Sequence, residues 1–356
     1  MVDYVWSGVS SDWNLATNWT PNGIPTSVDN VTINGSGYIL CWSTADAECN
    51  NLTLTVAMTE MLIFGFNATI YGDLTMDGGY FSGSGGPDYI IEIKGNVSSS
   101  GSATIAIGTG TGRDHEVILS GITKTFVWNS TASASFQHLT ISGEYVFSGT
   151  KLSVALVYQE FSVTGILDIS KTGLTINRID LRGTWGAFTG TIEGLGRIFY
   201  YYESTSVLPT GGTIQCRYFR LYLEDSLILV NPTVFLTPCE FEIEYRSDAQ
   251  IVRFTATARH YFYKFTIHCD LTVVDTALLD FATNDAEIYC DATFDIYKNA
   301  FPSAVFTIDL GDGIHVFRGT VDFYFSYSAG SATQLVVNPG EGTLFLYPKG
   351  LRVKTL

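Results

Sequence analysis

Asn51-Leu52-Thr53, Asp73-Leu74-Thr75 and Asn96-Val97-Ser98 are three copies of one short phrase, a polar residue followed by an apolar one and then Thr or Ser. Looser copies follow at Gly121-Ile122-Thr123, His138-Leu139-Thr140, Asp270-Leu271-Thr272 and Asp291-Ala292-Thr293. The first five copies start 22, 23, 25 and 17 residues apart. A wandering period of this length is typical of a unit that stacks on itself while its loops vary. We therefore expect a coil of stacked repeats.

The spacing of the phrase also predicts the type of coil. Filling the weaker repeats by strand alternation places coil starts near residues 51, 73, 96, 121, 138, 165, 191, 217, 240, 270, 291 and 320. The mean step is about 24 to 25 residues, which suits three short strands and three turns in each coil. No stretch of useful length keeps a helical period. The sequence predicts an all-β fold, a single-stranded parallel β-helix of about 12 rungs.

An antiparallel sandwich or barrel is the alternative fold. It would join strands through frequent tight hairpins of the Asn-Gly or Asp-Gly type. Those dipeptides are few in this chain, and they are Asn22-Gly23, Asn34-Gly35, Asp77-Gly78 and Asp312-Gly313. The parallel coil is therefore favoured.

Three segments are expected along the chain. Residues 1–35 contain Trp6, Trp13 and Trp19 among turn residues, and we interpret them as a Trp-rich cap over the open end of the apolar interior. Sugar stacking by the same tryptophans is the alternative. Residues 36–330 form the β-helix, and residues 331–356 form a C-terminal cap or an assembly tail.

The cysteines repeat the same period in the second half. Cys216, Cys239, Cys269 and Cys290 are 23, 30 and 21 residues apart and each precedes a strand-like run. We expect them to share one buried column, because an unoxidised Cys behaves as a small hydrophobic side chain. Metal sites favour close pairs of Cys, and none of the six cysteines lies nearer than eight residues to another. Cys41 and Cys49 are the one candidate for a local disulfide.

Composition and charge limit the function. The 356 residues are 46% hydrophobic and 15% charged, so the chain can bury a large core. Its net charge of -16 repels phosphate backbones and anionic headgroups. We expect no nucleic-acid binding and no membrane insertion. The start Met1-Val2-Asp3-Tyr4 lacks the basic and apolar regions of a secretory signal. We expect either that a signal was removed or that the protein is assembled inside a cell and leaves it as part of a virion.

The N-terminal segment carries a resemblance to known proteins. Trp6-Ser7-Gly8, Ser11-Asp12-Trp13, Asn18-Trp19, Ile24-Pro25 and Asp29-Asn30-Val31-Thr32-Ile33 resemble the lead-in to parallel β-helices of bacterial surface adhesins and of phage or viral fibre, spike and decoration proteins. The resemblance covers about a tenth of the chain. It implies an oligomeric β-solenoid at a virion surface or outside the cell. The chain departs from secreted adhesins in lacking an evident anchor or sorting tail.

The first part of the chain is rich in Asn-x-Ser/Thr sequons. Seven of the ten Asn up to residue 131 stand in one, namely Asn18, Asn30, Asn34, Asn51, Asn67, Asn96 and Asn129. One explanation is glycosylation, which suits a surface protein. The other is the repeat itself, because a turn Asn followed by an inward apolar residue and an outward Thr makes the sequon automatically. Asp73-Leu74-Thr75 has the same place without Asn, which favours the second explanation.

Catalytic and metal-binding patterns are weak. The five His residues are scattered, and neither a nucleophile elbow nor a phosphate-binding loop occurs. The enzymatic alternative is polysaccharide cleavage of the tailspike type by two carboxylates from neighbouring rungs, such as Asp270 with Asp291 or Asp275 with Asp295. Asp309 and Asp312 alone make an incomplete Ca²⁺ site. We expect no catalysis, no metal and no cofactor.

Aromatic runs are the remaining candidates for recognition. Phe199-Tyr200-Tyr201-Tyr202, His260-Tyr261-Phe262-Tyr263 and Phe323-Tyr324-Phe325 should alternate inward and outward. We expect outward strips that contact a glycan or another subunit, formed by Tyr200, Tyr202, Tyr261, Tyr263 and Tyr324. Ordinary stacking along the coil is the alternative.

Together these patterns predict a structural or receptor-binding protein on a virion surface. Its expected partners are further copies of itself, other virion proteins and host surface glycans. A cell-surface adhesin that binds glycans is the alternative, and a glycan depolymerase is the enzymatic one.

Overall fold

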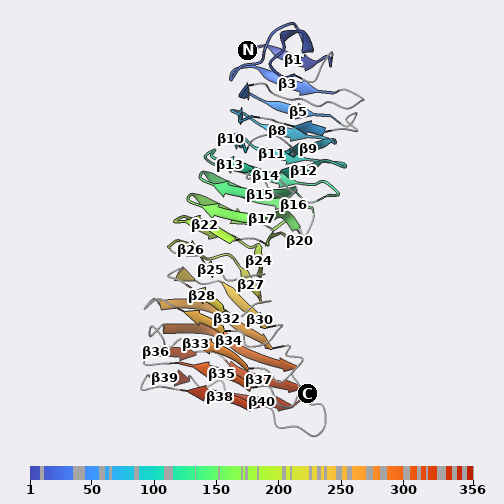
Figure 1. The fold of residues 1–356 in the computed structure, drawn as a ribbon. Helices are drawn as coiled ribbons and strands as arrows, with labels where there is room; N and C mark the ends of the chain where they lie inside the picture. Colours follow the sequence, from blue (N-terminus) through green and yellow to red (C-terminus); the bar gives the residue numbers. More distant parts are fainter. Residues whose placement is uncertain are drawn as a thin grey trace. The chain divides into compact units, whose positions relative to one another are not determined.

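The computed structural model describes the chain except at residues 9–11, 35–44, 56–60, 64–65, 84–87, 108–114, 133, 151–152, 170, 173–174, 183, 203–205, 209–210, 224–226, 231–233, 236–238, 246–250, 255–258, 270–275, 281–286, 300–304, 311–313, 318–319, 327–333, 339–342, 347–350 and 356. Within several strands only the backbone is described. The chain divides into two compact units, Met1–Asp180 and Leu181–Leu356. Each unit is a stack of parallel strands, so the predicted all-β parallel β-solenoid is confirmed (Figure 1).

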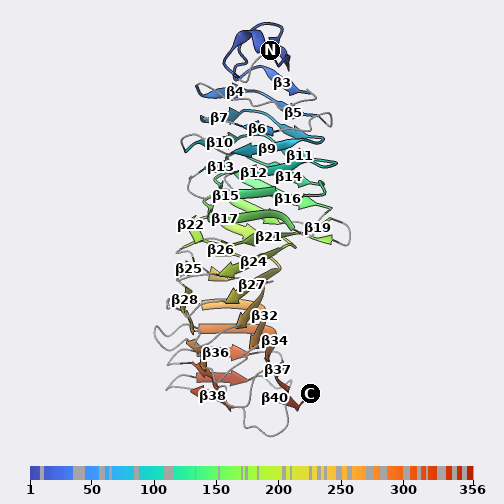
Figure 2. The same cartoon turned by 45° about the vertical axis from the view of Figure 1, so that its right-hand side comes forward.

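Three columns of strands build the first unit, and each coil contributes one strand to each column. The first column contains β1 (Asp3–Trp6), β3 (Asn30–Ile33), β5 (Leu52–Leu54), β8 (Leu74–Met76), β11 (Val97–Ser99), β14 (Lys124–Trp128), β16 (Glu144–Gly149) and β18 (Ile166–Ile169). The second contains β6 (Met61–Ile63), β9 (Tyr80–Gly83), β12 (Thr104–Ile107) and the first parts of β15 (Ala134–Ile141) and β17 (Ser153–Val163). The third contains β4 (Ala47–Cys49), β7 (Ala68–Ile70), β10 (Ile90–Ile93), β13 (Glu116–Leu119) and the remainder of β15 and β17 (Figure 2).

Short irregular elements flank these columns. They are the 3₁₀ turn η1 (Ala16–Asn18), the strand β2 (Trp19–Thr20), which is antiparallel to β1, and the antiparallel pair β19 (Lys171–Thr172) and β20 (Thr175–Ile176). The strand β21 (Arg178–Leu181) crosses the limit between the units.

The second unit repeats the parallel stacking with longer strands. One column contains β24 (Arg197–Tyr202), β27 (Tyr218–Leu223), β30 (Glu240–Tyr245), the latter parts of β32 (Arg259–Cys269) and β34 (Glu287–Asn299), then β37 (Thr320–Ser326) and β40 (Leu351–Thr355). Another contains β25 (Ser206–Leu208), β28 (Leu227–Val230), β31 (Ile251–Phe254), β33 (Thr276–Asp280), β35 (Val305–Asp309) and β38 (Gln334–Asn338). The other strands are β22 (Thr184–Phe188), β23 (Thr191–Glu193), β26 (Thr213–Ile214), β29 (Val234–Phe235), β36 (Ile314–Phe317) and β39 (Thr343–Leu346).

The repeated phrase forms strands because its apolar residues face inward. Leu52 pairs with Leu74, which pairs with Val97, and all three side chains are buried. Thr53 and Thr75 lie between them on the opposite side of the strand and are half-buried. The alternation removes one apolar row from water in every coil, which is the main stabilising term for such a stack.

A column of glycines sets the distance between coils in the first unit. A methyl group added at Gly95 would lie 1.9 Å from the carbonyl oxygen of Gly72, and one added at Gly165 would lie 1.9 Å from that of Gly143. At Gly143 the nearest atom would be the carbonyl oxygen of Gly121, at 2.0 Å. Such distances are far below any van der Waals contact, so the successive turns approach each other only because these positions lack a side chain.

The predicted number of rungs is wrong. The first unit stacks about seven turns, through β3, β5, β8, β11, β14, β16 and β18, whereas only six of the 12 coil starts predicted over residues 36–330 lie in this unit, near residues 51, 73, 96, 121, 138 and 165. The later copies of the phrase do not share a column with the first three. Thr123 is in a turn with φ of 54° before β14, and His138 lies in β15, in a different column from β11. The two Asp-initiated copies also differ, since residues 270–272 lie outside the described part and Asp291 lies within β34.

The Trp-rich segment also differs from a separate cap over residues 1–35. The strand β3 pairs with β5 as a turn of the coil, and β1 extends the same sheet in parallel. The three tryptophans pack against one another in this extension: the ring centroids of Trp6 and Trp13 each lie 4.8 Å from that of Trp19. At the other end, the strands of residues 331–356 continue the parallel pairing of the second unit.

The prediction that four cysteines share one buried column is only partly correct. Cys49, Cys216, Cys239 and Cys290 are buried thiols. Burial, together with the neighbouring Cys216 thiol, raises the pKa of Cys239 well above its ordinary value. Cys269, however, ends β32 opposite Lys298, whereas Cys290 pairs with Phe262. Cys41 lies outside the described residues, but Cys49 is a free thiol, so the structure does not contain the predicted bridge between them.

Candidate recognition surface

The outer side of β24 and β27 combines arginines with aromatic rings. In β24, Ile198 and Tyr200 are buried in the coil, so Arg197, Phe199 and Tyr201 stand on the other side of the strand. In β27, Phe219 and Leu221 point inward, which places Tyr218, Arg220 and Tyr222 beside that row. We call these six outer residues, with Arg182, the arginine–tyrosine face. Within it Phe199 and Tyr222 are covered by their neighbours and are only 6% and 7% exposed.

The rings of this face are covered on their flat sides. Tyr201 and Tyr222 stack with centroids 4.5 Å apart and planes 3° apart. The guanidinium carbon of Arg220 lies 4.5 Å from the Tyr222 centroid, and that of Arg182 lies 5.7 Å from the Tyr201 centroid. A similar contact of 5.5 Å joins Arg197 to Tyr218. Each guanidinium is thus attracted to a ring face by the ring's quadrupole, an interaction that does not use its N–H donors.

The arginines differ in their ionic partners. Arg220 Nε lies 3.0 Å from Glu242 Oε1, and Arg217 Nε lies 3.7 Å from Glu240 Oε1. Among the described residues, neither Arg182 nor Arg197 has a carboxylate within ion-pair distance. Arg182 is exposed and Arg197 is half-buried. The face therefore presents two positive charges that the described protein residues do not neutralise.

A second aromatic surface lies on β32 and β34. Tyr261 and Tyr263 are 36% and 48% exposed, whereas His260 and Phe262 are fully buried. The ring of Tyr261 stacks on that of Tyr289, with centroids 5.0 Å apart and an interplanar angle of 25°. These three residues form the exposed tyrosine cluster, in which the two exposed rings reach solvent.

The five predicted site tyrosines therefore have three different outcomes. Tyr261 and Tyr263 are exposed as expected, and their role in binding stays a prediction. Tyr200 is fully buried, so its predicted outward position is wrong, and its neighbour Tyr201 takes that position. For Tyr202 and Tyr324 only the strand backbone is described, so their side chains lie outside the described part of the chain.

The arginines of the face were missed in the sequence. The run Phe199-Tyr200-Tyr201-Tyr202 gives no alternation of polarity, and the in-out register was assigned from aromatic residues alone. Arg197 and Arg220 carried the missing signal, because a guanidinium in a strand of this coil must face outward. Counting in twos from Arg197 leads to Phe199 and Tyr201.

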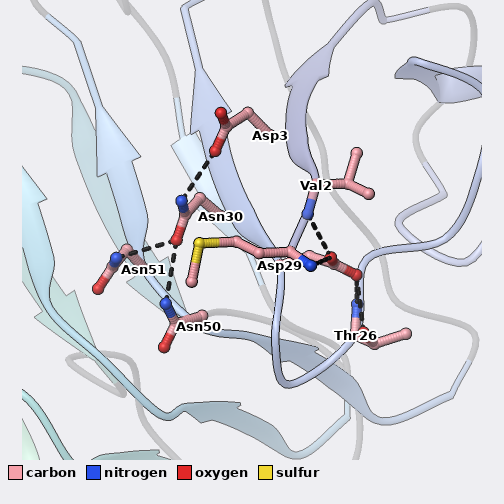
Figure 3. Close-up of polar contacts among 8 residues, drawn as sticks. Val2, Asp3, Thr26, Asp29, Asn30, Asn50 and Asn51 are labelled. Atoms are coloured by element: carbon pink, nitrogen blue, oxygen red, sulfur yellow. Dashed lines mark hydrogen bonds and ion pairs between the residues drawn. The ribbon is translucent and has the colours of Figure 1, made fainter.

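The first unit carries a different surface feature, a ladder of Asn and Asp side chains. Asn30 Nδ2 donates to Asp3 Oδ1 at 2.8 Å, and Asn30 Oδ1 accepts hydrogen bonds from Asn50 Nδ2 at 3.1 Å and Asn51 Nδ2 at 2.9 Å (Figure 3). Beside it, Asp29 accepts the backbone N–H of Val2 at 2.7 Å. The ladder thus joins three successive turns at the N-terminal end of the coil.

The same ladder continues through later coils by side chain to backbone bonds. Asn51 Oδ1 accepts the N–H of Asp73 at 2.7 Å, Asp73 Oδ1 accepts that of Asn96 at 2.7 Å, and Asn96 Oδ1 accepts that of Thr125 at 3.0 Å. Each acceptor bonds a backbone N–H just before or near the start of a strand in the following coil, and so joins the two coils.

This ladder supports the structural explanation of the sequons. Asn30, Asn51 and Asn96 use both the oxygen and the nitrogen of their amides in it. Asn18 is fully buried and donates to the carbonyl of Asp12, a position that argues against a glycan on this side chain in the folded chain. Asn34, Asn67 and Asn129 are exposed, and glycan attachment there stays a prediction.

The predicted acid pairs lie largely beyond the described side chains. Asp270, Asp275 and Asp312 are outside the described residues, and Asp291 and Asp295 are described in backbone only. Within the part of the chain that is described, no three His, Cys, Asp or Glu side chains are grouped as a metal site would need. The described segments also contain no helix of the length and apolarity that a bilayer crossing requires.

Comparisons with known proteins find no matching family, no matching curated protein and no matching solved structure. The resemblance to β-helix surface proteins is supported by the observed parallel β-solenoid alone, at the level of the fold.

Proposed function

We propose that this chain is a non-catalytic structural or receptor-binding protein at the surface of a virion, as in a fibre, spike or decoration protein. Its partners are further copies of itself and other virion proteins. The observation that carries the proposal is the exposed tyrosine cluster, because large amphipathic rings exposed to solvent suit contact with another macromolecule. A parallel coil also suits a role as a spacer, since its backbone groups pair from turn to turn.

A glycan-binding adhesin is the second candidate, and the arginine–tyrosine face favours it. Aromatic rings and guanidinium groups on one sheet face are the side chains that recognise sugars and their acidic substituents. Host surface glycans would then be the ligand of either a virion protein or an adhesin. Depolymerase activity would need a pair of carboxylates at a suitable distance, and none of the residues in the two aromatic surfaces forms one.

The test is mass photometry of the purified chain together with a glycan array. A stable homo-oligomer without a glycan signal supports the structural virion role, and an oligomer that binds glycans supports receptor binding. A monomer that binds a defined glycan moves the assignment to the adhesin. A bound glycan that becomes shorter on incubation overturns the non-catalytic proposal, and a monomer that binds nothing overturns the proposal as a whole.

A further inference from the structure

We infer that the arginine–tyrosine face binds an acidic glycan chain through paired contacts of its arginines with oxyanion groups. The inference rests on the proposed surface role and specifies its ligand class. Three features lead to it: the stacking of the rings, the unneutralised arginines and the distance between them.

The stacking argues against a neutral sugar as the main ligand. A neutral sugar packs its C–H face on the flat side of an exposed ring. On this surface Tyr201 lies between Tyr222 and Arg182, and Tyr222 lies between Tyr201 and Arg220. The flat sides of both rings are occupied by protein groups. The groups left for a ligand are ring edges and guanidinium N–H donors.

The charge distribution selects an anion. The whole chain has a net charge of -16, yet Arg182 and Arg197 have no carboxylate partner among the described residues. A ring behind each guanidinium orients the planar group without consuming its hydrogen-bond donors. Carboxylate and sulfate groups match this planar fork with two parallel hydrogen bonds. The chain's overall negative charge opposes the approach of any polyanion, so binding depends on these local contacts and weakens with salt.

The spacing favours a chain over a single sugar. Arg197 and Tyr201, the ring beneath Arg182, are four residues apart in β24, which corresponds to about 13 Å along a strand. One carboxylate cannot contact both guanidinium groups over that distance. A polymer with repeated acidic groups can, and its second contact is then intramolecular. A polymer should therefore bind much more tightly than its monomer.

The experiment measures binding of the full chain by biolayer interferometry to immobilised polygalacturonate, dextran sulfate and fully methyl-esterified polygalacturonate. We expect binding to at least one of the acidic polymers, little binding to the neutral ester and competition by free galacturonate only at much higher concentration. The polymer bound more tightly identifies the oxyanion as carboxylate or sulfate.

The variants assign the binding to this face. Arg182→Gln and Arg197→Gln should each weaken binding about tenfold, and the double variant should lose most of it. The double variant Lys94→Gln/Lys124→Gln removes the same charge from the first unit and should bind as the wild type does. Tyr201→Leu, which removes the ring under Arg182 but no charge, should weaken binding less than Arg182→Gln. Circular dichroism establishes that each variant is folded.

The inference is overturned if neither acidic polymer binds, if the ester binds as well as the acid, or if the arginine and lysine double variants behave alike. The proposed surface function can survive each of these results. It would still be supported by oligomers in mass photometry, or by a neutral glycan whose binding is lost in Tyr263→Ala.

Discussion

The two units differ in the outer side chains that most often join neighbouring turns, although in the first unit Lys94 also lies over the Tyr71 ring of the preceding turn. In the first unit, short Asn and Asp side chains accept backbone N–H groups of the next turn, as between Asn51 and Asp73. In the second unit, neighbouring turns are joined by long side chains, such as the Arg220–Glu242 ion pair and the Tyr201–Tyr222 stack. The apolar inward rows are alike in both.

This difference separates a purely structural surface from one with donors available for a ligand. A short amide that bonds the backbone of the next turn has its polar atoms occupied. A guanidinium that stacks on a ring keeps most of its N–H groups directed outward. The same coil can thus maintain its turns with the first kind of residue and present a ligand surface with the second.

The largest effect is expected at the glycine column of the first unit. Gly143→Ala places a methyl group where the carbonyl oxygen of Gly121 lies 2.0 Å away, so the two turns must separate. We expect a loss of about 3 kcal/mol or more in unfolding free energy. Hydrogen exchange of the intact chain should show lost protection near β16 and unchanged protection in the second unit. Ser142→Ala, at the exposed neighbour, is the control, and an equal loss there would contradict the steric explanation.

The next largest effect is a loss of folding stability in the second unit at acidic pH. Burial lowers the pKa of His260 to about 4 from an ordinary 6.5. Because the unfolded chain binds the proton more readily, the stability from neutral His260 is complete above pH 6.5 and is lost as the pH falls toward 4. This amounts to about 2 kcal/mol at pH 5. His260→Gln should remove this part of the difference between urea midpoints at pH 7 and pH 5. An unchanged difference would exclude His260 as the cause.

In the first unit, the carboxylate next to the N-terminus responds at lower pH. The hydrogen bond from Thr26 Oγ1 lowers the pKa of Asp29, and burial opposes this effect. The lowered pKa means that its contribution is present above the ordinary value of 3.8 and is lost only as the pH falls below it.

A smaller effect is expected from the polar ladder. Asp73→Ala removes the acceptor of the Asn96 N–H and should cost about 1 kcal/mol, whereas Asp73→Asn keeps an acceptor oxygen and should cost little. Urea midpoints at neutral pH measure both. If the two variants lose the same stability, the charge of Asp73 and not its hydrogen bond would be responsible.

The smallest effect is expected at an ion pair on the first unit. Lys94 Nζ lies 3.4 Å from Glu92 Oε2, with 38% and 31% of the two side chains exposed. Lys94 Nζ also lies 4.6 Å from the centroid of the Tyr71 ring. Exposed contacts of these two kinds contribute about 0.5 kcal/mol each, so Lys94→Gln should lower the thermal midpoint only slightly. A large decrease would mean that the first unit also depends on long charged side chains.

The coil could be predicted because Leu52, Leu74 and Val97 repeat an inward apolar position next to an outward Thr or Ser. The prediction lost the register at Thr123, whose positive φ belongs to a turn, and at His138, which occupies another column. The positions of the glycines indicate the correct register. Gly72, Gly95, Gly121, Gly143 and Gly165 each precede a strand of the first column, and their common place follows from close backbone approach.

The candidate surface could be predicted only in part. Tyr261 and Tyr263 alternate with residues that are clearly buried, and their exposure was expected. Four consecutive aromatic residues at 199–202 have similar hydrophobicity, and the inward side must then be identified from Arg197. The ion pairs of Arg217 and Arg220 involve residues 22 or more positions away. Their formation depends on the number of residues in that coil, which the repeated phrase at the start of the chain does not determine.

The glycine fit has a consequence for how such a chain can change its length. Gly72, Gly95, Gly121, Gly143 and Gly165 follow one another by 23, 26, 22 and 22 residues, and each close approach involves the turn immediately before it. Unequal steps are tolerated because the additional residues of a longer coil are accommodated in its loops. Removing a segment that runs from one glycine to the next rejoins two equivalent positions, whereas removing half of it places a side chain against a carbonyl. The chain is therefore divisible into modules, and it can grow or shrink by duplication or loss of a complete turn.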